Sequence, residues 1–340
     1  MTYTLTRRER ARRSTPWTLG RLLSVGVFWL ATLGLHPLTS AAAETARAAP
    51  GAAEPAARPS DNPPAEFFNV GITRAAFRNI NPNDAAAAYT VVLETIGRRH
   101  GRHFKATTLI FDDPAAFETT ILGGTLHLSV VGAWDYLSMH IDDVAKPSFA
   151  VTENGQVGRR YLILTRRDSG LNALSDMRGK SMVKLDYAAV GAALHWLDTL
   201  LAAGRLGSQE RFFGSVEVVG KPSAAVLPVF FGKKSACVVD ESSFKIMKEL
   251  NPQVGLALQV VATSERFADA LICVREHGWP SDALRAETME ALTDLPQDPG
   301  GRQILTLFKI DRLVPFRDEY LDTIRQLRAA YTKLTSEEER

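Results

Sequence analysis

The sequence predicts an α/β protein whose folded body is divided into two lobes. Short apolar runs alternate with helical segments along the chain, and short turns separate them. This repeated order of strand, helix and strand favours mainly parallel sheets that are flanked by helices. The body runs from about residue 67 to about residue 332, which is large for one hydrophobic core and suits two lobes of ordinary size.

Residues 1–43 have the features of a signal peptide. Five closely spaced arginines precede an apolar stretch at 22–35, and small residues follow at 40–43, where cleavage is expected. The apolar stretch holds about 14 residues, whereas a membrane-spanning helix needs about 20, so a signal peptide fits better than a permanent anchor. We therefore expect a periplasmic protein, with general secretion favoured over the twin-arginine route.

The charge of the chain changes once this leader is set aside. Residues 1–50 carry a net charge of +5 and the remaining residues carry −3, although the whole sequence carries +2. The basic character therefore belongs to the leader, which removes the main support for nucleic-acid binding. Residues 44–66 are mostly Ala and Pro and are expected to form a disordered linker, and 333–340 form a C-terminal tail.

Apolar patterns and helix signals define the elements of the body up to residue 164. Asn83 or Asp84 can cap the first helix, which Gly101 ends, and Gly123 with Gly124 ends the second. We expect helices at 85–100, 114–122 and 134–140. We expect strands at 67–72, 104–111, 126–131, 148–152 and 160–164, the last two flanking Gly155 as neighbours.

The segment 174–201 carries the clearest local signal. A polar turn with Gly179 leads into a strand at 181–185, and a small-residue turn at 186–191 follows. Apolar residues then recur with the spacing of one buried helical face, at Val190, Ala193, Leu194, Leu197 and Leu201. A turn of this kind directs free backbone N–H groups beyond the strand, where the helix dipole favours an anion.

The remaining elements continue the alternation. Further strands are expected at 215–219, 236–239, 256–262 and 271–274. Further helices are expected at 224–231, 242–250, 281–293, 299–308 and 317–332.

The sequence contains no recognisable catalytic or metal-binding pattern. The histidines are scattered, and there is no Gly-rich phosphate loop, paired carboxylate motif or nucleophile elbow. We therefore expect no enzyme, no cofactor and no metal. Cys237 and Cys273 lie inside apolar strand-like runs, where either a disulfide or two buried thiols is compatible with the periplasm.

Five motifs in one order resemble a known family. They are FNVGITRAAF (68–77), LHLSVVGAWDYL (126–137), YLILTRRDSGLNALSDMRGKSMV (161–183), SAAVLPVFFGKKSACVVD (223–240) and LPQDPGGRQIL (295–305). The chain resembles the periplasmic solute-binding proteins of phosphate/phosphite/phosphonate-type ABC transporters, which have the type II periplasmic binding-protein fold. The resemblance implies one lobe at 67–167 plus 264–332, a second at 168–263, and a hinge of two crossings between them.

The resemblance also implies a ligand cleft between the lobes, at turns that follow the carboxyl ends of strands. By position, it assigns ligand binding to Thr73, Arg74, Trp134, Tyr136, Asp186, Tyr187, Ala188, Ala189, Gly191, Ser223 and Asp240. Asp240 stands where phosphonate binders hold a ligand amine. Several of these residues also have a simpler explanation. The aromatic pair can cover a helix end, Arg74 can be a surface cation, and Asp186, Ser223 and Asp240 can cap helices or form turns.

Two positions depart from phosphonate binders. Ala188, Ala189 and Val190 replace a Ser/Thr-rich run at the anion turn, and Pro222 stands at or beside the position of a histidine. Backbone N–H groups remain, so an anion held there needs a cation such as Arg74 or Lys184 in place of the missing hydroxyls. The family is thus better defined than the ligand.

We therefore expect a monomeric extracytoplasmic protein that captures a small, anionic, phosphonate- or phosphate-like ligand for an ABC permease and ATPase. One alternative is a periplasmic sensor that presents its ligand to a receptor kinase. Another is an enzyme on the same fold. Neighbouring transporter or kinase genes would separate the first two functions, and ligand turnover would identify the third.

Overall fold

The structure is a computed structural model that describes residues 66–74, 81–185 and 192–338 of the 340-residue chain. One compact unit, Ser60–Arg340, contains all of them. The expected signal peptide, the expected linker up to residue 65 and the turn at 186–191 lie outside the described residues. Residue 66, expected in the linker, begins a strand, and residues 333–338 of the expected C-terminal tail continue a helix. Within the described part, no helix has the length and hydropathy needed to cross a membrane.

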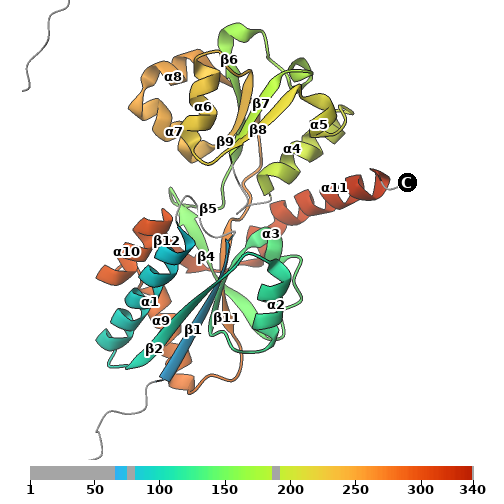
Figure 1. Cartoon of the computed structure of the whole chain (residues 1–340). Coiled ribbons are helices and arrows are strands. Elements are labelled where there is room, and N and C mark those ends of the chain that lie inside the picture. The colour runs from blue at the N-terminus through green and yellow to red at the C-terminus, as the bar shows by residue number, and fades with distance from the viewer. Residues whose placement is uncertain (1–65, 75–80, 186–191, 339–340) are drawn as a thin grey trace, which may run out of the picture. The chain divides into compact units, whose positions relative to one another are not determined.

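The first sheet has seven strands in the order β12-β4-β11-β3-β1-β2, and β5 pairs with β4 (Figure 1). Its strands are β1 (Glu66–Thr73), β2 (Phe104–Phe111), β3 (Leu128–Gly132), β4 (Ala145–Glu153), β5 (Gln156–Val157), β11 (Ala270–Arg275) and β12 (Arg312–Pro315). Its helices are α1 (Pro82–Arg99), α2 (Pro114–Leu122), α3 (Ala133–Tyr136), α9 (Asp282–Thr293), α10 (Pro299–Phe308) and α11 (Asp322–Glu338).

Both faces of the seven-stranded sheet are buried by helices. Alternate residues of β1, such as Val70 and Ile72, belong to the same buried cluster as Val92 of α1 and Ile304 of α10. Phe117 of α2 belongs to a second cluster, and Figure 1 places α2 across the sheet from α1. Period-two burial in strands and one apolar stripe per helix therefore produce the expected layers.

The second sheet has five strands in the order β10-β6-β9-β7-β8. These are β6 (Tyr161–Arg166), β7 (Ser181–Leu185), β8 (Ser215–Val219), β9 (Ala236–Asp240) and β10 (Leu258–Thr263). The helices between them are α4 (Ala192–Ala203), α5 (Gln209–Phe212), α6 (Pro222–Phe230), α7 (Glu241–Leu250) and α8 (Pro252–Ala257). Leu197 of α4 and Val229 of α6 are fully buried, as expected for helices that cover a sheet.

Most strands of each sheet run in one direction, and antiparallel strands lie among them. In the first sheet these are β11, which pairs antiparallel with β3 and β4, and β5 and β12, which both pair antiparallel with β4. In the second sheet it is β6, which pairs antiparallel with β9 and β10. The mixed α/β architecture with two helix-flanked sheets confirms the predicted fold class.

The chain passes between the sheets at two crossings, 158–160 and 264–269. They pair with each other, because Arg159 N–H donates to Phe267 O (2.8 Å) and Phe267 N–H donates to Arg159 O (2.9 Å). Arg266 joins them as well, since its guanidinium donates to Gly158 O at 3.0 Å and contacts Glu241 at 3.0 Å. Two paired backbone segments of this kind form the hinge.

The first crossing does not lie where the sequence predicted it. We expected the chain to leave the first sheet after residue 167, with 160–164 beside 148–152. Instead, β4 forms a short hairpin with β5, and β6 inserts between β9 and β10 of the second sheet. Apolar β6 is buried along almost its whole length, and a position inside the sheet satisfies its backbone on both sides.

Cys237 and Cys273 are free thiols. Cys237 lies on β9 and Cys273 on β11, in different sheets, and both are fully buried. Burial raises the pKa of both thiols far above the ordinary value. Of the two arrangements that the sequence left open, the structure has the buried thiols and not the disulfide.

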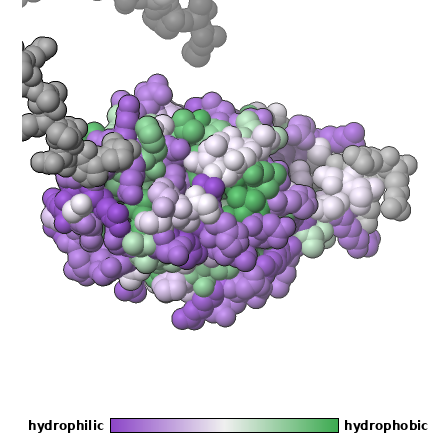
Figure 2. All heavy atoms as spheres, turned by 90° about the horizontal axis from the view of Figure 1, so that it is seen from below, coloured by the Kyte–Doolittle hydropathy of each residue, from purple (hydrophilic) through white to green (hydrophobic). Residues whose placement is uncertain are grey.

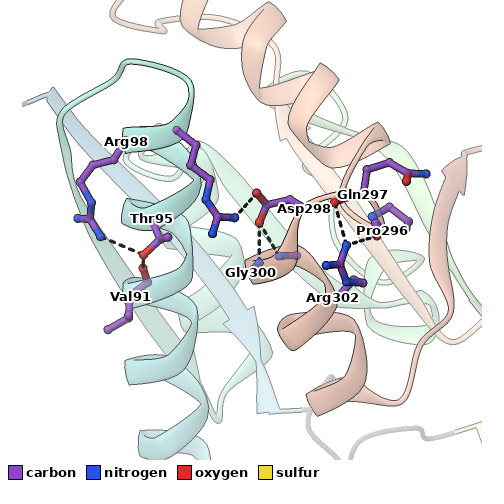
Figure 3. Close-up of polar contacts among 10 residues, drawn as sticks. Val91, Thr95, Arg98, Pro296, Gln297, Asp298, Gly300 and Arg302 are labelled. Carbon is purple, nitrogen blue, oxygen red and sulfur yellow. Dashed lines mark hydrogen bonds and ion pairs between the residues drawn. The ribbon is translucent and has the colours of Figure 1, made fainter.

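Asp298 ties α10 to α1 (Figure 3). Its carboxylate accepts from the N–H groups of Gly300 (2.7 Å) and Gly301 (3.0 Å), and Arg99 of α1 pairs with it. Burial alone would raise the pKa of Asp298, but these donors outweigh it and lower the pKa. The carboxylate is therefore more stable when ionised in the folded chain than in the unfolded chain.

We expect Asp298→Ala to lower the free energy of unfolding by about 1–2 kcal/mol at pH 7, because an N-cap is lost. A lowered pKa stabilises the fold above the ordinary aspartate pKa, and this contribution disappears as the pH falls through the folded value. The difference from wild type should therefore shrink between pH 4 and pH 2 in urea titrations. Exposed Asp282, in the first turn of α9, is the control, and Asp282→Ala should cost less than about 0.5 kcal/mol. An equal loss in both variants would contradict the capping role.

Candidate functional site

The candidate site lies at the carboxyl edges of the two sheets, defined here as the ends of their co-directional strands. In the first sheet these ends are Thr73, Phe111, Gly132 and Glu153. In the second sheet they are Leu185, Val219, Asp240 and Thr263. Both crossings run between these two edges, since they join β5 to β6 and β10 to β11. Open α/β sheets bind ligands at such edges.

Thr73 and Arg74 stand together at the carboxyl edge of the first sheet. The Thr73 hydroxyl is buried and has no hydrogen-bond partner among the described residues. Arg74 pairs with Asp112, which follows β2, at 3.0 Å, and both side chains are largely exposed. A buried hydroxyl without a partner is costly, so a ligand that bonds to Thr73 would remove that cost. Exposed pairs contribute little, so Arg74 remains available to an anion.

Trp134 packs against aromatic side chains of two other helices. Its ring stacks on His195 of α4, with centroids 4.0 Å apart, and the other neighbour of His195 is Tyr331 of α11 at 4.1 Å. The His195 Nδ1 atom is buried without a hydrogen-bond partner, and burial lowers the pKa of this imidazole to about 4. Trp134 therefore connects α3, beside the first sheet, with α4, beside the second.

The hydroxyl of Tyr136 is already hydrogen-bonded to a nearby residue of the same lobe. Its hydroxyl donates a hydrogen bond to Asp142. Burial and this carboxylate together raise the pKa of the phenol. Tyr136 is the last residue of α3, which ends four residues before the predicted limit of 140, and its hydroxyl is bonded to a residue that lies before β4.

Asp240 is the N-cap of α7. One carboxylate oxygen accepts from Ser243 N–H at 2.8 Å, and the other accepts from the Ser243 hydroxyl at 2.7 Å. Only 4% of the residue is exposed. The simpler explanation considered for Asp240 therefore describes its observed contacts. Ser223, in the first turn of α6, is exposed and carries no cap bond.

The predicted anion turn contributes five of the expected ligand residues, Asp186, Tyr187, Ala188, Ala189 and Gly191, and lies outside the described residues. On its two sides, β7 ends at Leu185 and α4 is present from Ala192. Lys184, the other cation considered for an anion there, donates to Gln209 at 2.7 Å instead. Of the two cations considered, only Arg74 is exposed at a carboxyl edge.

Sequence reasoning missed a buried ionic cluster at the hinge, formed by Glu153, Arg159 and Asp269. Arg159, at 6% exposure, pairs with Glu153 and lies 3.3 Å from Asp269. Burial, followed by the charge of Asp240, raises the pKa of Glu153 to about 7. The signal available in the sequence was a pair of arginines, Arg159 and Arg160, between a glycine turn and an apolar strand, but the acidic partner Asp269 is 110 positions from Arg159.

No group of three or more His, Cys, Asp or Glu side chains in the described ranges could hold a metal ion. The polar groups at the carboxyl edges are instead suited to binding a small polar molecule: a hydroxyl, an exposed guanidinium and a hinge rich in carboxylates.

Two helix-flanked sheets joined by two paired crossings give this chain the two-lobed α/β fold that solved periplasmic binding proteins have. Residues 75–321 match the sequence model of a family described as the periplasmic substrate-binding protein of phosphonate ABC transporters. The chain belongs to this family, which confirms the resemblance found in its motifs. Members are periplasmic and bind small molecules for permease and ATPase components. Among curated proteins, none matches the sequence.

Several solved binding proteins share this fold. XAC2383 of Xanthomonas citri, solved bound to ATP, has a TM-score of 0.59 at 13% identity, over 80% of this chain and 99% of that chain. A binding protein component of an ABC phosphonate transporter from Pseudomonas aeruginosa (PA3383) has a TM-score of 0.54 at 12% identity, over 79% and 87%. PhnD1 of Prochlorococcus marinus, solved with methylphosphonate, has a TM-score of 0.53 at 12% identity, over 79% and 99%. At these identities, the likeness concerns the fold alone.

Proposed function

We propose that this protein captures a small phosphonate- or phosphate-like anion between the carboxyl edges of its two sheets and delivers it to an ABC permease and ATPase. The family match over residues 75–321 carries the solute-binding role. The expected signal peptide at 1–43 and the linker at 44–66 would place the body, as a monomer, in the periplasm.

The anionic character of the ligand is supported by the groups at the first sheet's edge. Thr73 offers a buried hydroxyl without a partner, and Arg74 offers an exposed guanidinium beside it. Across the hinge, α4 would offer backbone N–H groups at its N-terminal end. Because Ala188 and Ala189 supply no hydroxyls, the side-chain contribution rests more heavily on Arg74.

A thermal-shift panel on the mature protein would test the proposal. The panel includes methylphosphonate, phosphate, phosphite, a sulfonate, a carboxylate and ATP. A ligand that binds only the folded state raises the melting temperature, by an amount that grows with ligand concentration. A shift with phosphonate or phosphate would support the proposal. A shift with ATP alone, or with carboxylates alone, would contradict the ligand class.

We expect Arg74→Ala to weaken binding of the best anion by at least about 1.5 kcal/mol, because a charge-assisted hydrogen bond is lost. Ala188→Ser should strengthen phosphonate binding by supplying a hydroxyl donor at the anion turn. Calorimetric titration measures both changes. Arg98→Ala, an exposed arginine on α1, is the matched control and should bind like wild type. If Arg74→Ala also binds like wild type, Arg74 does not hold the ligand.

A further inference from the structure

Glu153 occupies a distinctive place at the hinge. It is the last residue of β4 and receives a hydrogen bond from Arg159 of the first crossing. The next residue, Asn154, donates to the Ser242 hydroxyl in the first turn of α7 at 3.2 Å. Glu153 therefore lies where the first sheet meets the N-terminal end of a helix that belongs to the second sheet.

The groups around Glu153 contain more carboxylates than cations. Arg159 is shared between Glu153 and Asp269, and the Asp240 carboxylate acts on Glu153 from β9. The Glu153 side chain is 21% exposed. Among the described residues, the titratable and charged groups around Glu153 include Arg159, Asp240, Asp269, Tyr161, Lys309 and Asp311, and the Ser242 hydroxyl is hydrogen-bonded to Glu153. Burial first, and then the carboxylates of Asp240 and Asp311, disfavour ionised Glu153 more than the Ser242 hydroxyl and Lys309 favour it, and protonation relieves both costs.

We propose that Glu153 binds a proton that regulates the hinge, and that its protonated form favours closure of the two carboxyl edges on each other. Closure removes water from the crossings, which penalises a charged carboxylate more than a neutral one. An anion held at the same edges adds further repulsion. This coupling to ligand rests on the proposed function, whereas the response of the empty protein does not.

The sign of the pH effect follows from the raised pKa of Glu153, about 7 in the folded chain. In the unfolded chain an ordinary glutamate is already ionised at pH 6, so only the folded state gains a proton between pH 8 and pH 6. Lower pH therefore stabilises the fold through this group. The unfolding equilibrium constant of wild type should fall about tenfold from pH 8 to pH 6, relative to Glu153→Gln.

The first experiment uses the mature protein without ligand. Small-angle scattering should give a smaller radius of gyration at pH 6 than at pH 8 for wild type and no change for Glu153→Gln. Glu276→Gln is the control, because Glu276 is similarly buried at 25% exposure but pairs with Lys146 and Arg285 away from the crossings. It should respond to pH like wild type. If Glu153→Gln folds poorly, carbon-13 NMR of the Glu153 carboxyl in wild type is measured as a function of pH instead. A titration midpoint near pH 4.5 would overturn the proposal.

The second experiment adds methylphosphonate as the probe. The ratio of the affinity at pH 6 to the affinity at pH 8 should be about fivefold larger for wild type than for Glu153→Gln. Comparing the two ratios removes the effect of the ligand's own titration, which is the same for both proteins. An identical pH dependence in both proteins would overturn the proposed regulation. If neither protein binds any anion of the panel but scattering still responds to pH, the proposed ligand class fails and the proton-binding hinge stands.

Discussion

Replacing Arg159 by methionine should lower the free energy of unfolding by about 3–5 kcal/mol at pH 7. Arg159 is 6% exposed and is the counter-ion of both Glu153 and Asp269. Methionine fills much of the same space but removes the guanidinium that lies between half-buried Glu153 and buried Asp269, which is more costly than losing the whole cluster. Chemical denaturation followed by circular dichroism measures the loss.

The control for this substitution is Arg317→Met. Arg317 also pairs with a carboxylate, Glu319 at 3.3 Å, but both side chains are about two-thirds exposed. Exposed pairs contribute little, so the expected loss is below about 1 kcal/mol. The penalty of Arg159→Met should also decrease at low pH, as the stranded carboxylates take up protons. A loss below 1 kcal/mol at pH 7 would show that Arg159 is not the counter-ion of the hinge.

The second large effect is expected for Gly158→Ala, with a loss of at least about 2 kcal/mol in the free energy of unfolding. Gly158 has φ +79°, and a Cβ atom there would lie 2.3 Å from the backbone oxygen of Phe267. This oxygen accepts the Arg159 N–H bond that pairs the two crossings. The backbone cannot move aside without breaking that pairing, so the substitution acts directly on the hinge.

Gly155→Ala provides a matched control in the same segment. Gly155 has φ +71°, but nothing lies within 4 Å of an added Cβ atom. Only the cost of a left-handed backbone remains, about 1 kcal/mol. Equal losses in the two variants would mean that conformational preference, and not the contact with Phe267, accounts for the role of Gly158.

Local sequence patterns predicted most strands and helices, because whether a segment forms a helix or a strand depends mainly on residues close to it in the sequence. An aspartate N-cap followed by a proline begins both α2 and α10, and both helices have the predicted limits. Helix α8 was missed, although Asn251 caps it and Pro252 begins it, because the apolar residues after it favoured a strand. Short β5 and β12 carry too few residues for a periodic signal.

The pairing of β6 shows what local pattern cannot decide. Apolar strands 145–153 and 161–166 are close in sequence, and a glycine turn between them is typical of a hairpin. The second of these strands, β6, pairs instead with β9 and β10, which lie about 75–100 residues further on. The first crossing was misplaced for this reason.

For the candidate site, too, positions along the chain were predictable but contacts between distant residues were not. The resemblance placed Thr73, Arg74 and Trp134 at turns that follow strands, and the structure has Thr73 at the end of β1 and Trp134 in the helix that follows β3, whereas their role in ligand binding stays a prediction. Their partners are not local: Trp134 meets Tyr331 of α11, and Arg159 meets Asp269. Asp240 was assigned to a ligand amine by resemblance, but its contacts are those of a helix cap.

The two buried thiols make this protein a convenient starting point for an optical sensor. Cys237 and Cys273 are the only cysteines in the sequence, and neither is exposed to a labelling reagent in the folded state. A cysteine introduced at exposed Ser223, just beyond the carboxyl end of β8, would then be the single reactive position. A maleimide fluorophore attached there would report changes at the carboxyl edge of the second sheet through its emission, without prior removal of the native cysteines.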